Sequence, residues 1–183
     1  MSVKYKFHEP DGCYFVTYSV VDWADVFTRN TYKDILIESW KHCQKHKGLN
    51  IHAYVIMTNH VHMIISRKSE NTLEAIMRDM KKFTASKIIE AIQYSKEESR
   101  KEWLMGLFRK AGEENSNNKI FQFWQQDNHP MLCFNPDIFQ QKLTYVHQNP
   151  VRAGFVEKAE DWLYSSAGDY YLGRKGLIDI DRV

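Results

Sequence analysis

The sequence predicts a single α+β domain built on an antiparallel sheet with helices on one face. Short β-branched and aromatic runs alternate with longer segments whose apolar residues recur at helical spacing. The 183 residues, 43% of them hydrophobic, suffice for one folded core. No run approaches the ~18 apolar residues of a membrane span, and the N-terminus lacks the apolar segment of a signal peptide. We therefore expect a cytoplasmic protein with no membrane partner.

The first half of the chain predicts a strand, a helix and a hairpin. The expected elements are a strand at 13–20, a helix from 30–31 to about 47, and strands at 51–57 and 61–66. Asn30 is a suitable cap for the helix, and Gly48 is a suitable end. Only Thr58 and Asn59 separate the last two runs, so these runs should pair as an antiparallel hairpin.

The second half predicts helices around one more strand. The expected elements are a long helix opening at 71–74, its continuation or a separate helix within 96–108, a last strand at 120–125, and a helix starting at 135–136. Proline at 136 suits a first helical turn. This helix should end near Gln148, because Pro150 disfavours helical geometry at the residue before it. The order β-α-β-β-α-β, with helices added at the end, is the split βαβ or ferredoxin-like arrangement.

Two histidines occupy neighbouring positions on one face of the second hairpin strand. Side chains alternate in an extended segment, so His60 and His62 point the same way and Val61 points the other. Two adjacent imidazoles can hold a divalent metal ion. The same pair could also be a solvated surface feature, because a His-x-His sequence is a weak signal by itself. Its place on what should be a central strand favours the metal site.

The last helix carries a candidate nucleophile. Tyr145 and Asn149 are four residues apart, so they can face one site, whereas His147 lies about 200° around the helix from Tyr145. A phenol has a pKa of about 10 and needs activation, which a nearby divalent ion would assist. Alternatively, the Tyr145 ring packs in the core and Asn149 caps the helix. Together with the histidines, the tyrosine suggests metal-assisted attack on a phosphodiester.

Basic side chains on the long central helix are candidate DNA contacts. Arg78, Lys81, Lys82 and Lys87 can contact phosphates, although such a set is more often an ordinary solvated face. The net charge of +2 does not decide between these alternatives. The aromatic residues at 121–124 are expected in the core, although an exposed ring there could stack on a base.

Two segments of this sequence resemble the signatures of a known family. His60-Val61-His62 resembles the His-hydrophobic-His motif of the HUH single-tyrosine transposases. The segment from Tyr145 to Val156, Tyr-Val-His-Gln-Asn-Pro-Val-Arg-Ala-Gly-Phe-Val, resembles the signature of the REP-associated tyrosine transposases and their insertion-sequence relatives. The likeness extends from the strand at Tyr14 to residues 162–166, and it includes Met80-Lys-Lys-Phe-Thr and Trp124-Gln125.

The resemblance implies a DNA-processing enzyme. His60 and His62 would bind Mg²⁺ or Mn²⁺, with Asn149 at the position of the third ligand. Tyr145 would attack single-stranded DNA, leaving a 5′-phosphotyrosine link and a free 3′-hydroxyl, and strand transfer would follow without ATP. Members recognise imperfect DNA hairpins at element ends. The residues that we assign to DNA binding are Arg78, Lys81, Lys82, Lys87 and Arg152.

The resemblance leaves the assembly and the activity open. Some members are homodimers that exchange the tyrosine helix, and others act as monomers. Within a single domain spanning 1–183, the stretch 93–119 exceeds what compact members need, so we expect it to be a family-variable insert. The alternative function is a non-catalytic module that binds single-stranded nucleic acid, either a domesticated relative or an RNA-binding ferredoxin-like domain. Against RNA binding, histidines stand where stacking rings would be expected.

Overall fold

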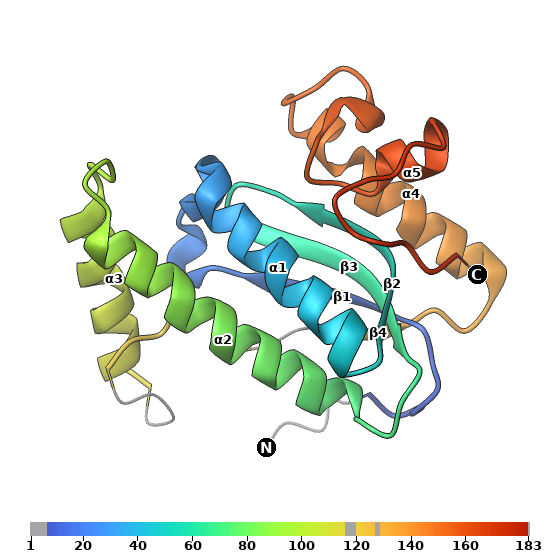
Figure 1. Cartoon of the computed structure of the whole chain (residues 1–183), viewed down its shortest axis with the longest axis horizontal. Helices are drawn as coiled ribbons and strands as arrows, with labels where there is room; N and C mark the ends of the chain where they lie inside the picture. The colour runs from blue at the N-terminus through green and yellow to red at the C-terminus, as the bar shows by residue number, and fades with distance from the viewer. Residues whose placement is uncertain (1–6, 116–119, 127–128, 183) are drawn as a thin grey trace.

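The computed structural model describes residues 7–115, 120–126 and 129–182, and within them a four-stranded antiparallel sheet is packed against helices (Figure 1). The elements are β1 (Tyr14–Ser19), α1 (Asn30–His46), β2 (Leu49–Ile56), β3 (His60–Arg67), α2 (Leu73–Tyr94), α3 (Lys101–Glu113), β4 (Met131–Leu132), α4 (Pro136–Arg152) and α5 (Ala167–Tyr171), with short 3₁₀ turns at Val21–Trp23, Val26–Thr28 and Ala159–Asp161. No helix in this described part of the chain has the length and apolar character needed to cross a membrane.

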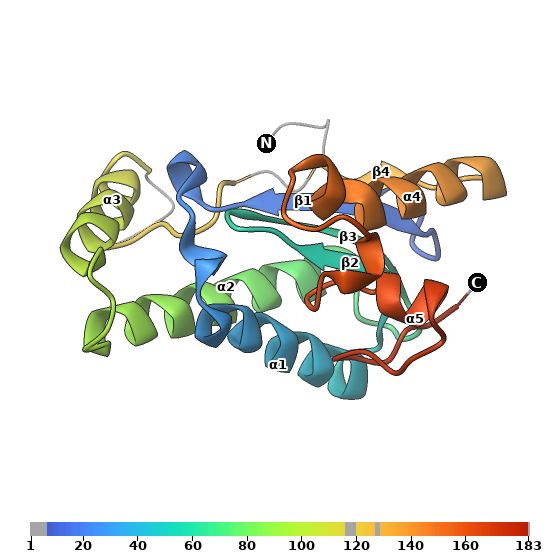
Figure 2. The same ribbon diagram turned by 90° about the horizontal axis from the view of Figure 1, so that it is seen from above.

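The strand order β2-β3-β1-β4 confirms the ferredoxin-like prediction. Strand β3 pairs antiparallel with both β1 and β2, so the two strands joined by α1 run in the same direction with β3 between them. Helices α1 and α2 cover one face of the sheet, and α4 lies across the opposite face (Figure 2). The predicted C-terminal helix is therefore the element that covers the second face.

Burial on both faces explains the composition of the strands. In β1, Tyr14, Val16 and Tyr18 enter the main core with α1 and α2, whereas Phe15 enters a smaller core with α4. A strand covered on both sides has no solvent-facing positions to fill with polar residues. For this reason most central positions of β2 and β3 are apolar. His60 and His62 of β3 are polar exceptions on the side that faces α4.

The last strand lies later in the chain than predicted. Strand β4 is the short segment Met131–Leu132, which pairs with the start of β1, and the prediction of a strand at 120–125 is wrong. In that segment Trp124 makes only an isolated bridge with Val20. The rings of Phe123 and Trp124 are buried in the main core, as expected for this aromatic group. Ring burial and two backbone hydrogen bonds, from Val21 N–H to the Phe123 carbonyl at 2.9 Å and from Gln125 N–H to the Ser19 carbonyl at 2.8 Å, hold the segment beside the end of β1.

Helix α4 continues through Pro150 to Arg152, so the predicted end near Gln148 is also wrong. Proline lacks the N–H that would donate to the carbonyl of Val146, four residues earlier. The loss is limited because the proline lies in the last turn, where Ala153 N–H donates to the Asn149 carbonyl at 3.0 Å. The proline is itself buried, and packing outweighs the missing hydrogen bond. Asn149 consequently remains helical.

The stretch predicted as an insert is joined to the main core. Helix α3 is separate from α2, and its Leu104 and Phe108 side chains are fully buried. Residues 116–119 of the stretch lie outside the described residues. Variability of this stretch within a family stays a prediction.

Candidate active site

Helix α4 places the tyrosine beside the two histidines of β3. The residues that dock α4 on the sheet are buried and apolar: Leu143 and Val146 from α4, with Phe15, Val55 and Ile64 from the strands. The ring centres of His60 and His62 lie 4.7 Å apart, and the ring centre of Tyr145 lies 5.1 Å from that of His62. The three side chains meet within one subunit, so this arrangement needs no exchange of α4 in a homodimer.

His62 is held in a fixed, neutral state. Its ring is buried, stacks on Phe15 at 5.5 Å between ring centres, and places Nδ1 2.7 Å from the Thr17 hydroxyl. Burial, and to a lesser extent the charges of His60 and Lys142, lower the pKa of His62 to about 3. When Nδ1 carries the proton and donates to Thr17, Nε2 keeps its lone pair available for a metal ion.

His60 is oriented by two carboxamides. Its Nδ1 lies 2.7 Å from Asn59 Oδ1. This oxygen accepts a hydrogen bond from Nδ1–H, so that Nε2 of the neutral ring keeps its lone pair. Burial lowers the pKa of His60, and a hydrogen bond with the Asn149 side chain partly opposes this shift. Asn149 lies one helical turn after Tyr145, on the same side of α4. In contrast, His147 faces away and hydrogen-bonds Ser166 at 2.8 Å.

These donors fit a divalent ion with open coordination positions. Metal-binding histidines usually have the other ring nitrogen held by a hydrogen bond, as Thr17 and Asn59 do here. Among the described residues no group of three or more His, Cys, Asp or Glu side chains is placed to hold a metal. The amide oxygen of Asn149 could serve as a third protein ligand of a site at His60 and His62.

Two cationic side chains flank the ring of Tyr145. The Lys142 Nζ lies 5.9 Å from the ring centre, and the guanidinium carbon of Arg152 lies 5.8 Å from it. The ring is only half-buried, with its edge against Phe15. The flanking charges are suited to stabilising a phosphate group beside the phenol. Lys142 is absent from the sequence-based candidates, although a cation three residues before Tyr145 on a helix is a usable signal.

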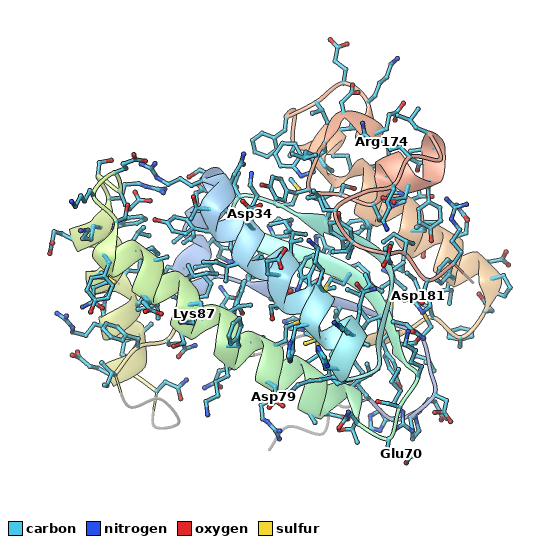
Figure 3. All side chains as sticks on the ribbon, in the orientation of Figure 1. Asp34, Glu70, Asp79, Lys87, Arg174 and Asp181 are labelled. Atoms are coloured by element: carbon cyan, nitrogen blue, oxygen red, sulfur yellow. The ribbon has the colours of Figure 1, made fainter. Side chains whose placement is uncertain are left out.

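The five predicted DNA-binding side chains do not form one patch. Arg78, Lys81 and Lys82 line a groove of about 1400 Å³ between α2 and residues 120–126, where Lys81 Nζ donates to the Gln125 carbonyl at 2.8 Å. Lys87, labelled on α2 in Figure 3, lies outside that groove and pairs with Glu90 at 2.8 Å. Arg152 is at Tyr145, across the sheet. The predicted basic face of α2 therefore divides between two locations, and Arg152, predicted separately, lies at a third.

Comparison with known proteins identifies the family. Residues 16–130 match the family model described as "Transposase IS200 like". A REP-associated tyrosine transposase bound to a REP hairpin has a similar structure, with a TM-score of 0.67 and 17% identity over 100% of this chain and 95% of that chain. A candidate transposase of Deinococcus radiodurans R1 aligns over 50% of this chain and 72% of that chain, with 17% identity and a TM-score of 0.38. Curated proteins give no match.

The matched segment holds the framework of the site. It contains most of β1, the β2–β3 hairpin with His60 and His62, and α2, and it ends before α4. The similarity of fold to the hairpin-bound structure extends over the entire chain, including α4. Because the family model matches well over half of the sequence, this chain belongs to the IS200-like transposase family.

Proposed function

We propose that this protein cleaves and rejoins single-stranded DNA, with Tyr145 as the nucleophile and with His60, His62 and Asn149 as ligands of a divalent metal ion. The observation that supports the proposal most strongly is the convergence of two distant elements. Helix α4 brings the Tyr145 ring to 5.1 Å from the His62 ring, measured between centres, beside the apolar residues that dock α4 on the sheet. A common role in catalysis would explain why Tyr145 and the two histidines lie together.

The chain's own side chains have separable tasks in this mechanism. The Tyr145 oxygen forms a bond to phosphorus while the bond from phosphorus to the 3′-oxygen breaks. The phenol loses its proton and the 3′-oxygen takes one up, which leaves a 5′-phosphotyrosine and a 3′-hydroxyl. Lys142 and Arg152 are placed to stabilise negative charge on the phosphate and the phenolate. The covalent link keeps the phosphoester energy, so a second 3′-hydroxyl can attack it and rejoin the strand without ATP.

The proposed metal ligands are Nε2 of both histidines and the amide oxygen of Asn149. When bound, Mg²⁺ or Mn²⁺ supplies Lewis-acid chemistry, polarising a phosphate oxygen and stabilising charge on the leaving oxygen. Asn59 Oδ1 favours the His60 tautomer that leaves Nε2 unprotonated, and the Thr17 hydroxyl favours the same tautomer of His62 when it accepts from Nδ1–H.

We further propose hairpin DNA as the ligand, by analogy with the similar structure that is bound to a REP hairpin. The groove lined by Arg78, Lys81 and Lys82 supplies cations for phosphate contacts. At its end, Gln125 N–H donates to the Ser19 carbonyl at 2.8 Å, and Ser19 pairs with His60 in the sheet. DNA held in the groove would thus reach the edge of the candidate active site.

A gel assay under denaturing conditions tests the proposal. We expect a labelled oligonucleotide with a hairpin and a single-stranded flank to become covalently attached to the protein in Mn²⁺ or Mg²⁺. EDTA added before the DNA should prevent attachment, and excess metal should restore it, because attack on the phosphate needs the Lewis acid. Hairpin binding that is unaffected by EDTA, together with no attachment in any metal, would instead support the non-catalytic binding module.

The donor set also predicts a metal preference. Mg²⁺ favours shells composed of oxygen, whereas imidazole suits Mn²⁺ better, so two histidines should favour Mn²⁺. Calorimetric titration should show tighter binding of Mn²⁺ than of Mg²⁺, and His62→Gln should weaken the binding of Mn²⁺. Equal or weaker binding of Mn²⁺ by the unaltered protein would contradict the proposed ligand set.

A further inference from the structure

The turn that follows β1 holds an exposed tryptophan in a strained backbone. Asp22 and Trp23 have φ angles of 51° and 54°, in the left-handed region that bulky residues seldom adopt. The Trp23 side chain nevertheless remains 55% exposed, so burial of the indole does not compensate for the strain. Strained residues that persist beside a candidate active site often serve the function of that site.

One carboxamide ties this turn to the histidine pair. Asn59 Nδ2 donates to the Trp23 carbonyl at 3.1 Å, and Asn59 Oδ1 accepts from His60 Nδ1 at 2.7 Å. The indole itself lies against His60, with 5.7 Å between ring centres and 69° between ring planes. The backbone of Asn59 also accepts from Val20 N–H at 2.9 Å. Trp23 is therefore fixed at the rim of the candidate active site.

The turn also adjoins the end of the groove that Arg78, Lys81 and Lys82 line. Gln125 and Gln126 line the groove that contains Lys81 and Lys82, and they also line a smaller depression beside Val21 and Asp22. The neighbouring rings of Phe123 and Trp124 are buried and cannot accept a base. A strand that leaves the groove toward His60 would pass the exposed indole of Trp23.

We propose that Trp23 is the stacking platform for one unpaired DNA base next to the phosphodiester that Tyr145 attacks. This inference rests on the proposed function and names a contact within it. Every base has an aromatic face, so an indole can hold single-stranded DNA with little regard for its sequence. Stacking fixes the nucleotide, and thereby its phosphate, relative to His60 and the Tyr145 phenol. Trp23 then positions the substrate and takes no part in bond making.

The test measures the affinity of Trp23→Ala, Trp23→Phe and Trp103→Ala for a hairpin oligonucleotide with a single-stranded flank, by fluorescence anisotropy. Trp103 lies on α3 and is 54% exposed, so it is a matched control for the loss of a surface indole. We expect about a tenfold or greater loss of affinity for Trp23→Ala, and recovery of most of it with Trp23→Phe. Trp103→Ala should bind as the unaltered protein does.

A scan of abasic substrates identifies the stacked base. Removing that one base should weaken binding by the unaltered protein as much as Trp23→Ala does, and should have no further effect on Trp23→Ala. In the covalent attachment assay, the same variant should need more DNA to reach its half-maximal rate, and its maximal rate should also fall, because stacking both binds the nucleotide and positions its phosphate. Calorimetric binding of Mn²⁺ should be unchanged, which separates stacking from a loss of His60 orientation.

Two results would overturn the proposal: unaltered affinity in Trp23→Ala, or a loss of affinity that is the same for every abasic position. Failure of the proposed function is distinguishable from both. If the unaltered protein forms no covalent attachment in any metal, the catalytic assignment fails. If affinity still depended on Trp23 and on one base in that case, the stacking contact would be established. Its position next to a cleaved phosphodiester would not be.

Discussion

Tyr145→Phe is expected to abolish covalent attachment to single-stranded DNA, a loss of at least about a thousandfold. Phenylalanine lacks the oxygen that forms the bond to phosphorus, and no other change in the site is required. The aromatic ring is kept, so its edge contacts with Phe15 and His62 remain. Hairpin binding should therefore stay within about twofold of the unaltered protein, since the affinity comes from phosphate contacts elsewhere. A labelled oligonucleotide on a denaturing gel measures the attachment, and anisotropy measures the binding.

The control for this variant is Tyr171→Phe. Tyr171 ends α5, away from the groove lined by Arg78, Lys81 and Lys82, and is 50% exposed, so removing its hydroxyl tests a general effect of tyrosine loss. Tyr171→Phe should form the covalent link at the normal rate. Attachment that persists in Tyr145→Phe would assign the nucleophile to another residue.

Glu98→Ala is expected to lower the free energy of unfolding by about 3 kcal/mol. The side chain is fully buried between α2 and α3. It accepts from Arg29 Nε at 3.0 Å, from Arg100 Nε at 3.0 Å and from the Tyr32 hydroxyl at 3.1 Å. Its removal takes the acceptor away from these three donors and weakens the connection of the α2–α3 junction to the start of α1, which the hydrogen bond from Arg100 to the Asp25 carbonyl still maintains. The expected cost is at the low end for a buried pair because both arginines are about one-third exposed.

Urea denaturation compares Glu98→Ala with Glu90→Ala as a control. Glu90 pairs with Lys87 on the surface of α2, with both side chains about half exposed. An exposed pair of this kind contributes little, so Glu90→Ala should change the free energy of unfolding by less than about 0.5 kcal/mol. Equal effects of the two variants would mean that the network at Glu98 is not a source of stability.

The same carboxylate predicts a pH dependence. Burial raises the pKa of Glu98, but hydrogen bonds and charge from Arg100, assisted by Tyr32, outweigh that effect and lower the pKa to about 2. The pKa in the folded state is thus below the ordinary value of 4.5. The stabilisation is complete above about pH 4.5 and is lost as the pH falls toward 2. Thermal melts across this range should show a steeper loss for the unaltered protein than for Glu98→Ala.

Local periodicity was enough to predict the parts of the site that depend on one element. The two-residue repeat of a strand places His60 and His62 on one face, and the helical repeat places Tyr145 and Asn149 on one side of a helix. The alternation of apolar runs likewise predicted the ferredoxin-like order of elements, which the sheet confirms. These features follow from residues that are close in sequence, so the sequence by itself determines them.

Packing between distant elements decided the rest. Only the docked position of α4 shows that Tyr145 reaches the histidines and that Lys142 and Arg152 flank its ring. Segment 120–125 buries Phe123 and Trp124 in the core and joins the end of β1 by an isolated bridge, and α4 continues through the buried Pro150 beyond its predicted end. Likewise, the position of Trp23 against His60 depends on a turn whose strained backbone is held by Asn59. Such outcomes depend on which surfaces exclude water together, and no periodicity within a single segment encodes that choice.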